Sequence, residues 1–450
     1  LGDGGLRPGE IVTEKAMASV YGKGSDPVTG EQLGRPYPTF KSAAGRIADA
    51  VAGLPAELSE EARAAAVAGI EAHVKANPSR SAVAGFDLTF TVPKSASVLW
   101  ALGEETVQAE VVGAHRAAID GVLELIEDRF LHTRIGAQSC AQVPARGLIA
   151  AAFDHFDSRA GDPHLHTHVV VANKVQGPDG QWRSVDGQEL YRAAVALSEV
   201  YNDLFADQLA QRLPVTWSWR ERGPRSSPVF EIDGVDDDLL AVFSQRSVQI
   251  SAQLEDLVAD FTAERGREPS RAEVLRLRQR ATLVTRPEKE IHPLAELRDT
   301  WRATATAATG KRPAELVDPA LTSTQFAALA IENGLAVDTG ADPAALAEAV
   351  LAGVAVRRPT WTRANLLAEA ARATRHLRLT DPAQRIALLD QVVEATLARC
   401  VALDPPELFR TRRSSVAWTA PASSTGRRRP RSPPPRSSMP KPGCWPRWRT

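Results

Sequence analysis

Apolar and polar positions alternate along several short segments of the chain. The first is FDLTFTV at residues 86–92, which is rich in β-branched and aromatic residues and is followed by Pro93. Two more apolar runs, RGLIAAAFDHF at 146–156 and HLHTHVVVANKV at 164–175, flank a short polar loop. Alternation with this composition predicts strands, and the short loop predicts that the second and third strands pair antiparallel.

Longer segments have the apolar spacing of amphipathic helices. They are VQAEVVGAHRAAIDGVLELIEDRF at 107–130 and GQELYRAAVALSEVYNDLFADQLAQRL at 187–213, and helical patterning also prevails from about Asp236 to Leu403. The turn GPDG at 177–180, followed by WRSVD, predicts a hairpin. Hairpins alternating with long helices predict an α+β fold, in which helices cover one face of a mainly antiparallel sheet.

The same pattern divides the chain into three predicted regions. Residues 1–235 hold the sheet and its helices, and residues 236–403 form a helical region. Residues 404–450 are a tail rich in Arg, Pro and Ser without apolar periodicity, which predicts disorder. We interpret this tail as the product of translation out of frame in a high-GC gene; the alternative is a basic tail that binds nucleic acid.

The net charge of −1 conceals an uneven distribution. From Thr411 to Thr450 there are ten Lys and Arg and no Asp or Glu, so the other 410 residues carry 44 basic and 55 acidic groups. These 410 residues have a net charge of −11 and offer no overall electrostatic attraction for nucleic acid. Any DNA contact therefore has to come from local basic patches. The strongest is the basic run at 270–289, for which a solvated helix face is the plainer interpretation.

The composition of the chain also indicates the cellular compartment in which we expect the protein. The chain contains no run of about 18 apolar residues, so we expect no membrane insertion. Its first residues lack the basic start and apolar core of a signal peptide. Cys140, Cys400 and Cys444 are far apart and odd in number, which predicts a reducing environment without a disulfide framework. We therefore expect a cytoplasmic protein.

Four of the nine histidines fall within fourteen residues: His155, His164, His166 and His168. Alternate side chains of a strand share a face, so the last three point the same way. The loop at 157–163 lets the strand that holds His155 fold back, which brings His155 near His166. Three imidazoles that converge in this way are a ligand set for Zn, Mn, Ni or Fe rather than for Ca.

Two plainer interpretations of these histidines stand beside catalysis. A lone histidine is usually a satisfied surface or core residue, but that does not explain three at strand spacing with a fourth across a hairpin. The second alternative is a purely structural metal site. With no cysteine nearby and only three expected ligands, one coordination position stays open, which favours chemistry on a substrate.

The segment FDHFDSRAGDPHLHTHVVVANKV at 153–175 resembles the metal motif of the MobF-class conjugative relaxases of the TrwC/TraI type, which are HUH endonucleases. GFDLTFTVPKSAS at 85–97 is similar to the family's second signature, whose Asp corresponds to Asp87. LSEVYNDLFADQL, FSQRSVQI and GREPSRAEVLRLRQRATLVTRPEK resemble the family's downstream helices. The resemblance covers roughly residues 5–405, and the first two motifs together are highly specific.

The resemblance implies an HUH palm in which His155, His166 and His168 bind a divalent metal ion, with Mg, Mn, Zn and Ni as candidates. The ion would bind a non-bridging oxygen of the scissile phosphate. Asp87 would orient a ligand histidine or help to take up the proton of the nucleophile. His164 occupies the variable position of the motif, and we interpret it as a neighbour of the ligands.

The resemblance also implies single-stranded DNA or a transfer-origin hairpin as the partner, with other conjugation proteins as further candidates. The candidate DNA contacts are Lys94, Arg159, Arg276, Arg278 and Arg280, and Arg271 and Lys289 extend the basic run. Arg159 is also expected to hold its loop by pairing with Asp157 or Asp162.

Relaxases of this type attack DNA with a tyrosine, often one of a Tyr-Tyr pair, that lies upstream of the first region matched by the resemblance. This chain has four unpaired tyrosines: Tyr21, Tyr37, Tyr191 and Tyr201. The first two lie in the stretch that follows the family's tyrosines, and the other two belong to a downstream helix, where we expect them to pack or to bind DNA. We therefore expect a truncated relaxase without its nucleophile, and a start at Leu1 rather than Met agrees with this expectation.

Relaxases of this family often continue into a helicase. The candidate phosphate-binding loop of this chain, residues 305–311, begins with Ala where the first Gly belongs and is followed by Arg312 in place of Ser or Thr. ATP binding is therefore not expected.

The predicted function is metal-dependent, strand-specific DNA nicking and strand transfer at a plasmid transfer origin, impaired by the loss of the tyrosine. Two alternatives stay open. One is a catalytically silent remnant that binds origin DNA without cutting it, and the other is an unrelated metal phosphoesterase that uses water as nucleophile. The sequence therefore leaves open whether this chain is itself an active enzyme.

Overall fold

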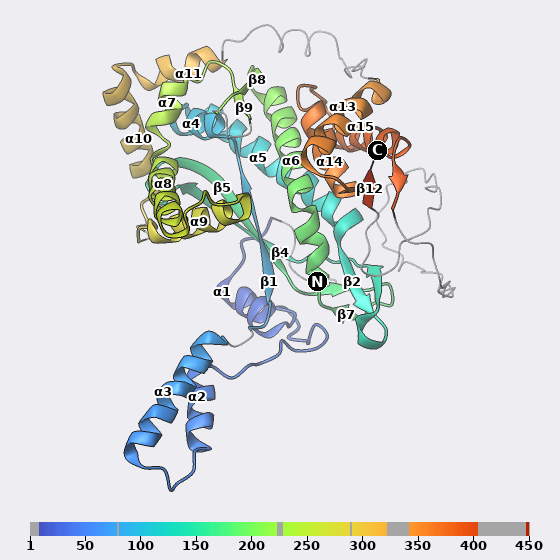
Figure 1. Ribbon diagram of the computed structural model, residues 1–450. Coiled ribbons are helices and arrows are strands. Elements are labelled where there is room, and N and C mark those ends of the chain that lie inside the picture. The colour runs from blue at the N-terminus through green and yellow to red at the C-terminus, as the bar shows by residue number, and fades with distance from the viewer. Residues whose placement is uncertain are drawn as a thin grey trace. The chain divides into compact units, whose positions relative to one another are not determined.

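The computed structural model describes residues 9–78, 81–222, 228–288, 290–321, 342–403 and 447–449 (Figure 1). The chain divides into two compact units. The first consists of Leu1–Leu88, Leu131–Ala151 and Val170–Gly187, and the second of Thr89–Phe130, Ala152–Val169 and Gln188–Thr450. The units interleave along the chain, whereas the three regions predicted from the sequence are consecutive, and those regions stay a prediction.

The first unit contains short helices and two-stranded ribbons. Its helical segments are α1 (Glu14–Met17), η1 (Ala18–Lys23), α2 (Ala43–Ala52), α3 (Glu60–Ala76) and η3 (Ala137–Ser139), and its strands are β2 (His132–Ile135), β3 (Ala141–Pro144), β6 (Val175–Gln176) and β7 (Trp182–Arg183). Ser42 and Ser59 begin α2 and α3, because each side chain accepts a backbone N–H of the first turn. The two helices pack against each other as a hairpin (Figure 1).

Three strands continue from one unit into the other. They are β1 (Gly85–Thr91), β4 (Ala150–Asp157) and β5 (Pro163–Ala172), and their order in the sheet is β1-β5-β4. β5 is the central strand, and most of its residues are buried. These strands coincide with the three segments whose alternation predicted them.

The second unit is mainly helical. Its helices are α4 (Lys94–Leu102), α5 (Glu105–Leu125), η2 (Ile126–Phe130), α6 (Gly187–Arg212), α7 (Asp237–Val242), α8 (Gln245–Arg265), α9 (Arg271–Val284), α10 (Leu294–Thr309), α11 (Pro313–Leu321), α13 (Pro343–Arg357), α14 (Arg363–Thr374) and α15 (Pro382–Leu397). Its short strands are β8 (Trp217–Arg220), β9 (Val229–Ile232), β10 (Trp361–Thr362), β11 (Val401–Ala402) and β12 (Arg447–Arg449). The pairs β2–β3, β6–β7 and β8–β9 are antiparallel, and the predicted α+β fold is confirmed.

The core of the second unit forms where α5 and α4 bury their apolar faces. Val111, Ala114 and Ala118 of α5 are completely buried, at the spacing of three and four residues that places side chains on one face of a helix. Trp100 of α4 stacks on Phe156 of β4 with ring centroids 5.7 Å apart. The helices are thereby packed against the part of β4 that belongs to this unit.

In the C-terminal tail, residues 447–449 form β12, which pairs antiparallel with β10 and β11. The predicted disorder of the tail as a whole stays a prediction. Residues 404–446 and Thr450 lie outside the described residues. No helix in the described part of the chain is both long and apolar enough to cross a membrane.

Candidate metal centre

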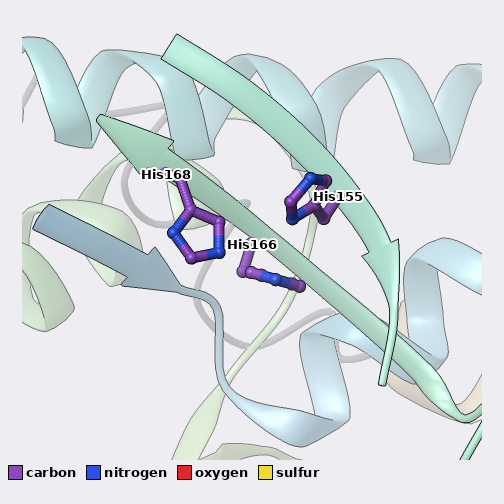
Figure 2. A group of neighbouring side chains, drawn as sticks. All are labelled: His155, His166 and His168. Atoms are coloured by element: carbon purple, nitrogen blue, oxygen red, sulfur yellow. The ribbon is translucent and has the colours of Figure 1, made fainter. Parts of the chain in front are cut away.

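Three histidine side chains meet on two adjacent strands. His155 lies on β4, and His166 and His168 lie on β5 with one residue between them. Alternate residues of a strand project from the same face, so the two β5 imidazoles point the same way. Figure 2 shows all three rings turned toward one space, with His155 opposite the other two. The predicted spacing therefore brings the three side chains together.

The three rings are nearly equidistant. Their centroids lie 5.2 Å (His155–His166), 5.0 Å (His155–His168) and 5.3 Å (His166–His168) apart, and one nitrogen of each ring lies within 4.8 Å of the others. A transition metal binds imidazole nitrogens at about 2.0–2.1 Å, which in a tetrahedral site places them about 3.3 Å apart. Small rotations of the rings therefore close the site around an ion, and three imidazole nitrogens fit Zn, Mn, Ni or Fe.

In His166 and His168, a hydrogen bond to Nδ1 determines which ring nitrogen faces the centre of the site. Nδ1 of His166 lies 2.7 Å from the backbone oxygen of His164. A carbonyl oxygen only accepts, so this Nδ1 carries the proton and Nε2 keeps its lone pair for a metal. Nδ1 of His168 lies 3.3 Å from Oγ1 of Thr89 on β1, which leaves its Nε2 for the same centre. Thr89 was not predicted from the sequence, where its one signal is its place two residues after Asp87 on the same face of a strand.

The loop between β4 and β5 is held by hydrogen bonds on several sides. Oδ2 of Asp162 accepts from Oγ of Ser158 and from the backbone N–H of Arg246, each at 3.1 Å. Nε1 of Trp301 on α10 donates to the carbonyl of Gly161 at 2.7 Å. The φ angle of Gly161 is +76°, a conformation that glycine adopts without strain. The turn that directs His155 toward the β5 histidines is therefore supported from α8 and α10.

Arg159 does not have the partner that the sequence predicted within this loop. Asp162, one of its two expected partners, is bound by Ser158 and Arg246 instead. The serine hydroxyl and the backbone N–H reach this carboxylate from nearby positions, which leaves no need for a long guanidinium. Among the described residues Arg159 forms no ion pair. Its contact with DNA stays a prediction.

His164 lies beside the three-histidine group but is not part of it. Its ring centroid lies 4.6 Å from that of His166, and burial together with His166 lowers the pKa of His164 to about 4. Its backbone carbonyl provides the acceptor that orients His166. The interpretation of His164 as a neighbour of the ligands stays a prediction.

Two further candidate residues lie on either side of the boundary between the units. Asp87 is exposed on the part of β1 that belongs to the first unit, and the histidines belong to the second, so its role stays a prediction. Lys94, at the start of α4, donates from Nζ to the carbonyl of Pro163 at 2.8 Å. Burial lowers the pKa of Lys94 to about 8. This lysine anchors the start of β5, a role that the sequence analysis did not anticipate.

The basic run predicted to contact DNA forms α9. Arg276, Arg278 and Arg280 are exposed there, but they do not form a single stripe. One turn separates Arg276 from Arg280, whereas Arg278 is rotated by about 200° from Arg276. Arg271 is exposed at the start of the helix, and Lys289 lies outside the described residues.

Three of the four tyrosines have structural contacts. The hydroxyl of Tyr21 donates to the carbonyl of Val170 at 2.6 Å, and burial raises the pKa of Tyr21 to about 12. The hydroxyl of Tyr37 donates to backbone carbonyls at 3.1 and 3.3 Å. Tyr201 is buried with its hydroxyl 2.6 Å from a histidine ring, so it packs as expected. Tyr191, on α6, is 86% exposed.

The family model described as TrwC relaxase matches residues 2–308. The chain belongs to the TrwC relaxase family. The match contains the three-histidine group and both sequence motifs, so the resemblance inferred from those motifs is confirmed. It also includes α8, α9 and all but the last residue of α10, whereas α13, α14 and α15 lie beyond it.

Individual relatives cover smaller parts of this TrwC-family chain. It is 31% identical over 134 residues to the multifunctional conjugation protein TraI of Escherichia coli, a match that covers 28% of this chain and 7% of TraI. The chain therefore spans only a small part of this relative. Structures of the conjugative relaxase TrwC in complex with OriT DNA, metal-free and metal-bound, are 31% identical to it. Each match covers 50% of this chain. The metal-free structure is covered to 73% with a TM-score of 0.40, and the metal-bound structure to 71% with a TM-score of 0.41.

Proposed function

We propose that this chain is a relaxase domain for metal-dependent, strand-specific nicking and strand transfer at a plasmid transfer origin in conjugation, and that the reaction is impaired in this chain because it lacks a tyrosine placed to attack the DNA. The observation that carries the proposal is the convergence of His155, His166 and His168 from two strands within the family-matched residues. TrwC, to which the chain is 31% identical, has been solved with OriT DNA and with bound metal, which supports the same ligand classes for this chain.

The chemistry proposed for this centre follows from its open coordination. Three ligands leave a position for a phosphate oxygen, and a divalent ion there would stabilise the negative charge that develops on that oxygen. The chain's own residues prepare the site: the carbonyl of His164 and the hydroxyl of Thr89 hold the ligand rings of β5 through their Nδ1 atoms. We assign to Asp87 the orientation of a ligand histidine or the uptake of a proton from the attacking hydroxyl.

Single-stranded DNA is the substrate that best matches the charges of the chain. Outside residues 411–450 the net charge is −11, so affinity has to arise from local arginines such as Arg159, Arg276, Arg278 and Arg280, together with bases stacking on aromatic side chains. Each neutralised phosphate releases condensed counterions, so binding should weaken steeply as salt rises. Measured affinities for single strands should therefore exceed those for duplex DNA of the same sequence.

We further propose that none of Tyr21, Tyr37 and Tyr201 attacks DNA. Their hydroxyls are engaged by carbonyls or by a ring, and burial raises the pKa of Tyr21 and Tyr201, which opposes formation of a phenolate. Tyr191 is exposed on a helix, where no such constraint holds it in place. The contacts of the three engaged tyrosines favour a second candidate function, in which the chain binds the origin DNA without cleaving it.

Incubation of the full chain with Mn²⁺ and single-stranded origin DNA labelled at both ends tests these proposals. We expect DNA that is bound but intact, and no protein–DNA adduct after denaturation. A cleaved strand with free ends would indicate water as nucleophile. An adduct that maps to Tyr21, Tyr37 or Tyr201 would contradict the assignment above, and an adduct at Tyr191 would contradict binding without cleavage. As a control, a tyrosine-bearing segment of another TrwC relaxase joined to the N-terminus should produce the adduct, and His166→Ala in that fusion should abolish it.

A further inference from the structure

A chain of polar side chains, three of them buried, lies behind the three histidines. Thr167 stands between His166 and His168 on β5, so its side chain projects from the opposite face of the strand. Asp154 likewise precedes His155 on β4. The two non-ligand side chains meet, because Oγ1 of Thr167 lies 2.6 Å from Oδ1 of Asp154. The backs of both ligand-bearing strands are therefore joined by one hydrogen bond.

This hydrogen bond continues into the helices of the second unit. Oγ1 of Thr167 also lies 2.8 Å from Nε2 of His115 on α5, and Nδ1 of His115 lies 2.6 Å from the hydroxyl of Tyr201 on α6. At the other end, Arg116 donates to Oδ2 of Asp154 at 3.0 Å. His115 and Tyr201 are 1% and 2% exposed. We call the group of Tyr201, His115, Thr167, Asp154 and Arg116 the relay.

Each hydrogen bond of the relay has one direction. The carboxylate of Asp154, paired with Arg116, can only accept, so the hydroxyl of Thr167 donates to it. The oxygen of Thr167 then accepts from Nε2–H of His115, and Nδ1 of His115 accepts from the hydroxyl of Tyr201. This order requires a neutral imidazole, and burial, only partly opposed by Asp154, lowers the pKa of His115 to about 4.

We propose that His115 is a positioning residue for the metal centre, which fixes the ligand-bearing strands from behind through Thr167 and Asp154. The proposal rests on the metal site of the proposed function. Thr167 and Asp154 are sequence neighbours of all three ligand histidines, so a shift of either backbone moves at least one imidazole. A metal ion tolerates errors of only about 0.2 Å in ligand distance, so the relay has to hold the two strands where small rotations of the three rings complete the site.

A merely structural role would have a different signature. Any cavity in the core lowers the free energy of unfolding, but it leaves the relative positions of the ligands unchanged once the protein is folded. Loss of a group that orients metal ligands instead lowers metal affinity, by about 10- to 100-fold where such contacts have been removed in other sites. Affinity and the spectrum of the bound ion therefore separate the two roles.

The test titrates the full chain with Co²⁺ and records its affinity and its visible absorption. His115→Leu and Thr167→Val should each weaken Co²⁺ binding about 10- to 100-fold and shift the absorption bands. His115→Gln, which keeps an N–H for Thr167, should restore most of the affinity. The matched control is Val111→Ala, one turn before His115 on α5 and equally buried, which should lower stability but bind Co²⁺ as the wild type does.

Thermal unfolding of each variant shows whether it is folded at the titration temperature, and Thr167→Val replaces His115→Leu if the latter is not. The proposal is overturned if the folded variants bind Co²⁺ with the affinity and spectrum of the wild type. It is also overturned if Val111→Ala loses as much affinity as they do. Failure of the wild type itself to bind Co²⁺, Mn²⁺ or Zn²⁺ would instead refute the proposed metal site.

Discussion

Two polar networks of the second unit hold helices in different ways. The relay behind the metal centre uses a phenol, a neutral imidazole and a hydroxyl, and it ends in a single ion pair. The second network is charged throughout. It joins three carboxylates of α6 to four arginines of α14, α15 and the segment between them, and its members are Glu199, Asp203, Asp207, Arg372, Arg375, Arg378 and Arg385. We call this second network the arginine cluster.

The arginine cluster is built from short, multiple contacts. Nε and Nη2 of Arg385 lie 2.8 and 2.7 Å from the two carboxylate oxygens of Asp207, a bidentate pair. Nε of Arg375 lies 2.7 Å from Asp203, and its Nη2 lies 2.6 Å from Glu199. Arg385 and Asp203 are completely buried. The C-terminal helices beyond the family-matched residues are thereby fixed to α6.

The comparison shows what each kind of network is suited to. Every member of the relay is either donor or acceptor toward its neighbour, so the relay specifies one arrangement of the two strands. The ion pairs of the arginine cluster are also directed, but burial makes each of their charges costly when its partner is lost. The relay is therefore suited to positioning ligands, and the arginine cluster to docking helices.

The largest effect is expected at the site that the relay supports. His166→Ala or His168→Ala removes one of the three proposed ligands, so each should abolish metal binding, whereas His164→Ala should retain most of it. Elemental analysis of the purified, dialysed proteins after loading with Zn²⁺ gives the metal content per chain, with about one ion expected for the wild type. Equal loss on changing His164 would contradict the ligand assignment.

The next largest effect is expected in the arginine cluster. Asp207→Ala leaves Arg385 and Arg378 without their shared carboxylate, and we expect a loss of about 3–5 kcal/mol in the free energy of unfolding, measured with urea. The control is Glu394→Ala on α15, which removes an exposed pair with Arg363 and should cost about 1 kcal/mol or less. Folded Asp207→Ala should bind metal like the wild type. A metal defect as large as that of His115→Leu would remove the distinction between the networks.

The sequence predicts the candidate metal ligands better than it predicts the residues that hold them in place. His155, His166 and His168 are found because a strand repeats every two residues and a short loop returns the chain, so local spacing contains the information. Contacts between distant segments have no such signal: His115 is 52 residues from Thr167 and 86 from Tyr201. The arginine cluster joins residues more than 170 positions apart, and the sequence shows its members only as charges on helices.

The smallest of the three effects is a pH dependence that arises at His115 of the relay. The pKa of His115 is lowered from 6.5 to about 4 by burial, so between these values the unfolded chain binds a proton that the folded chain does not. Stability therefore rises with pH across this window and is lost as pH falls from about 6.5 to about 4. A shift of this size corresponds to about 3 kcal/mol at most for this residue.

Urea unfolding of metal-free protein at intervals between pH 4 and pH 7 measures this dependence. His115→Gln has no group to protonate, so it should lose less stability on acidification than the wild type, by up to about 3 kcal/mol across the window. His73→Gln, a change at an exposed histidine of α3, should follow the wild-type curve. Parallel curves for wild type and His115→Gln would mean that His115 accepts a proton in the folded protein as readily as in the unfolded chain. The fixed direction of hydrogen bonds would then be lost, and with it the contrast between a neutral relay that positions ligands and a charged cluster that docks helices.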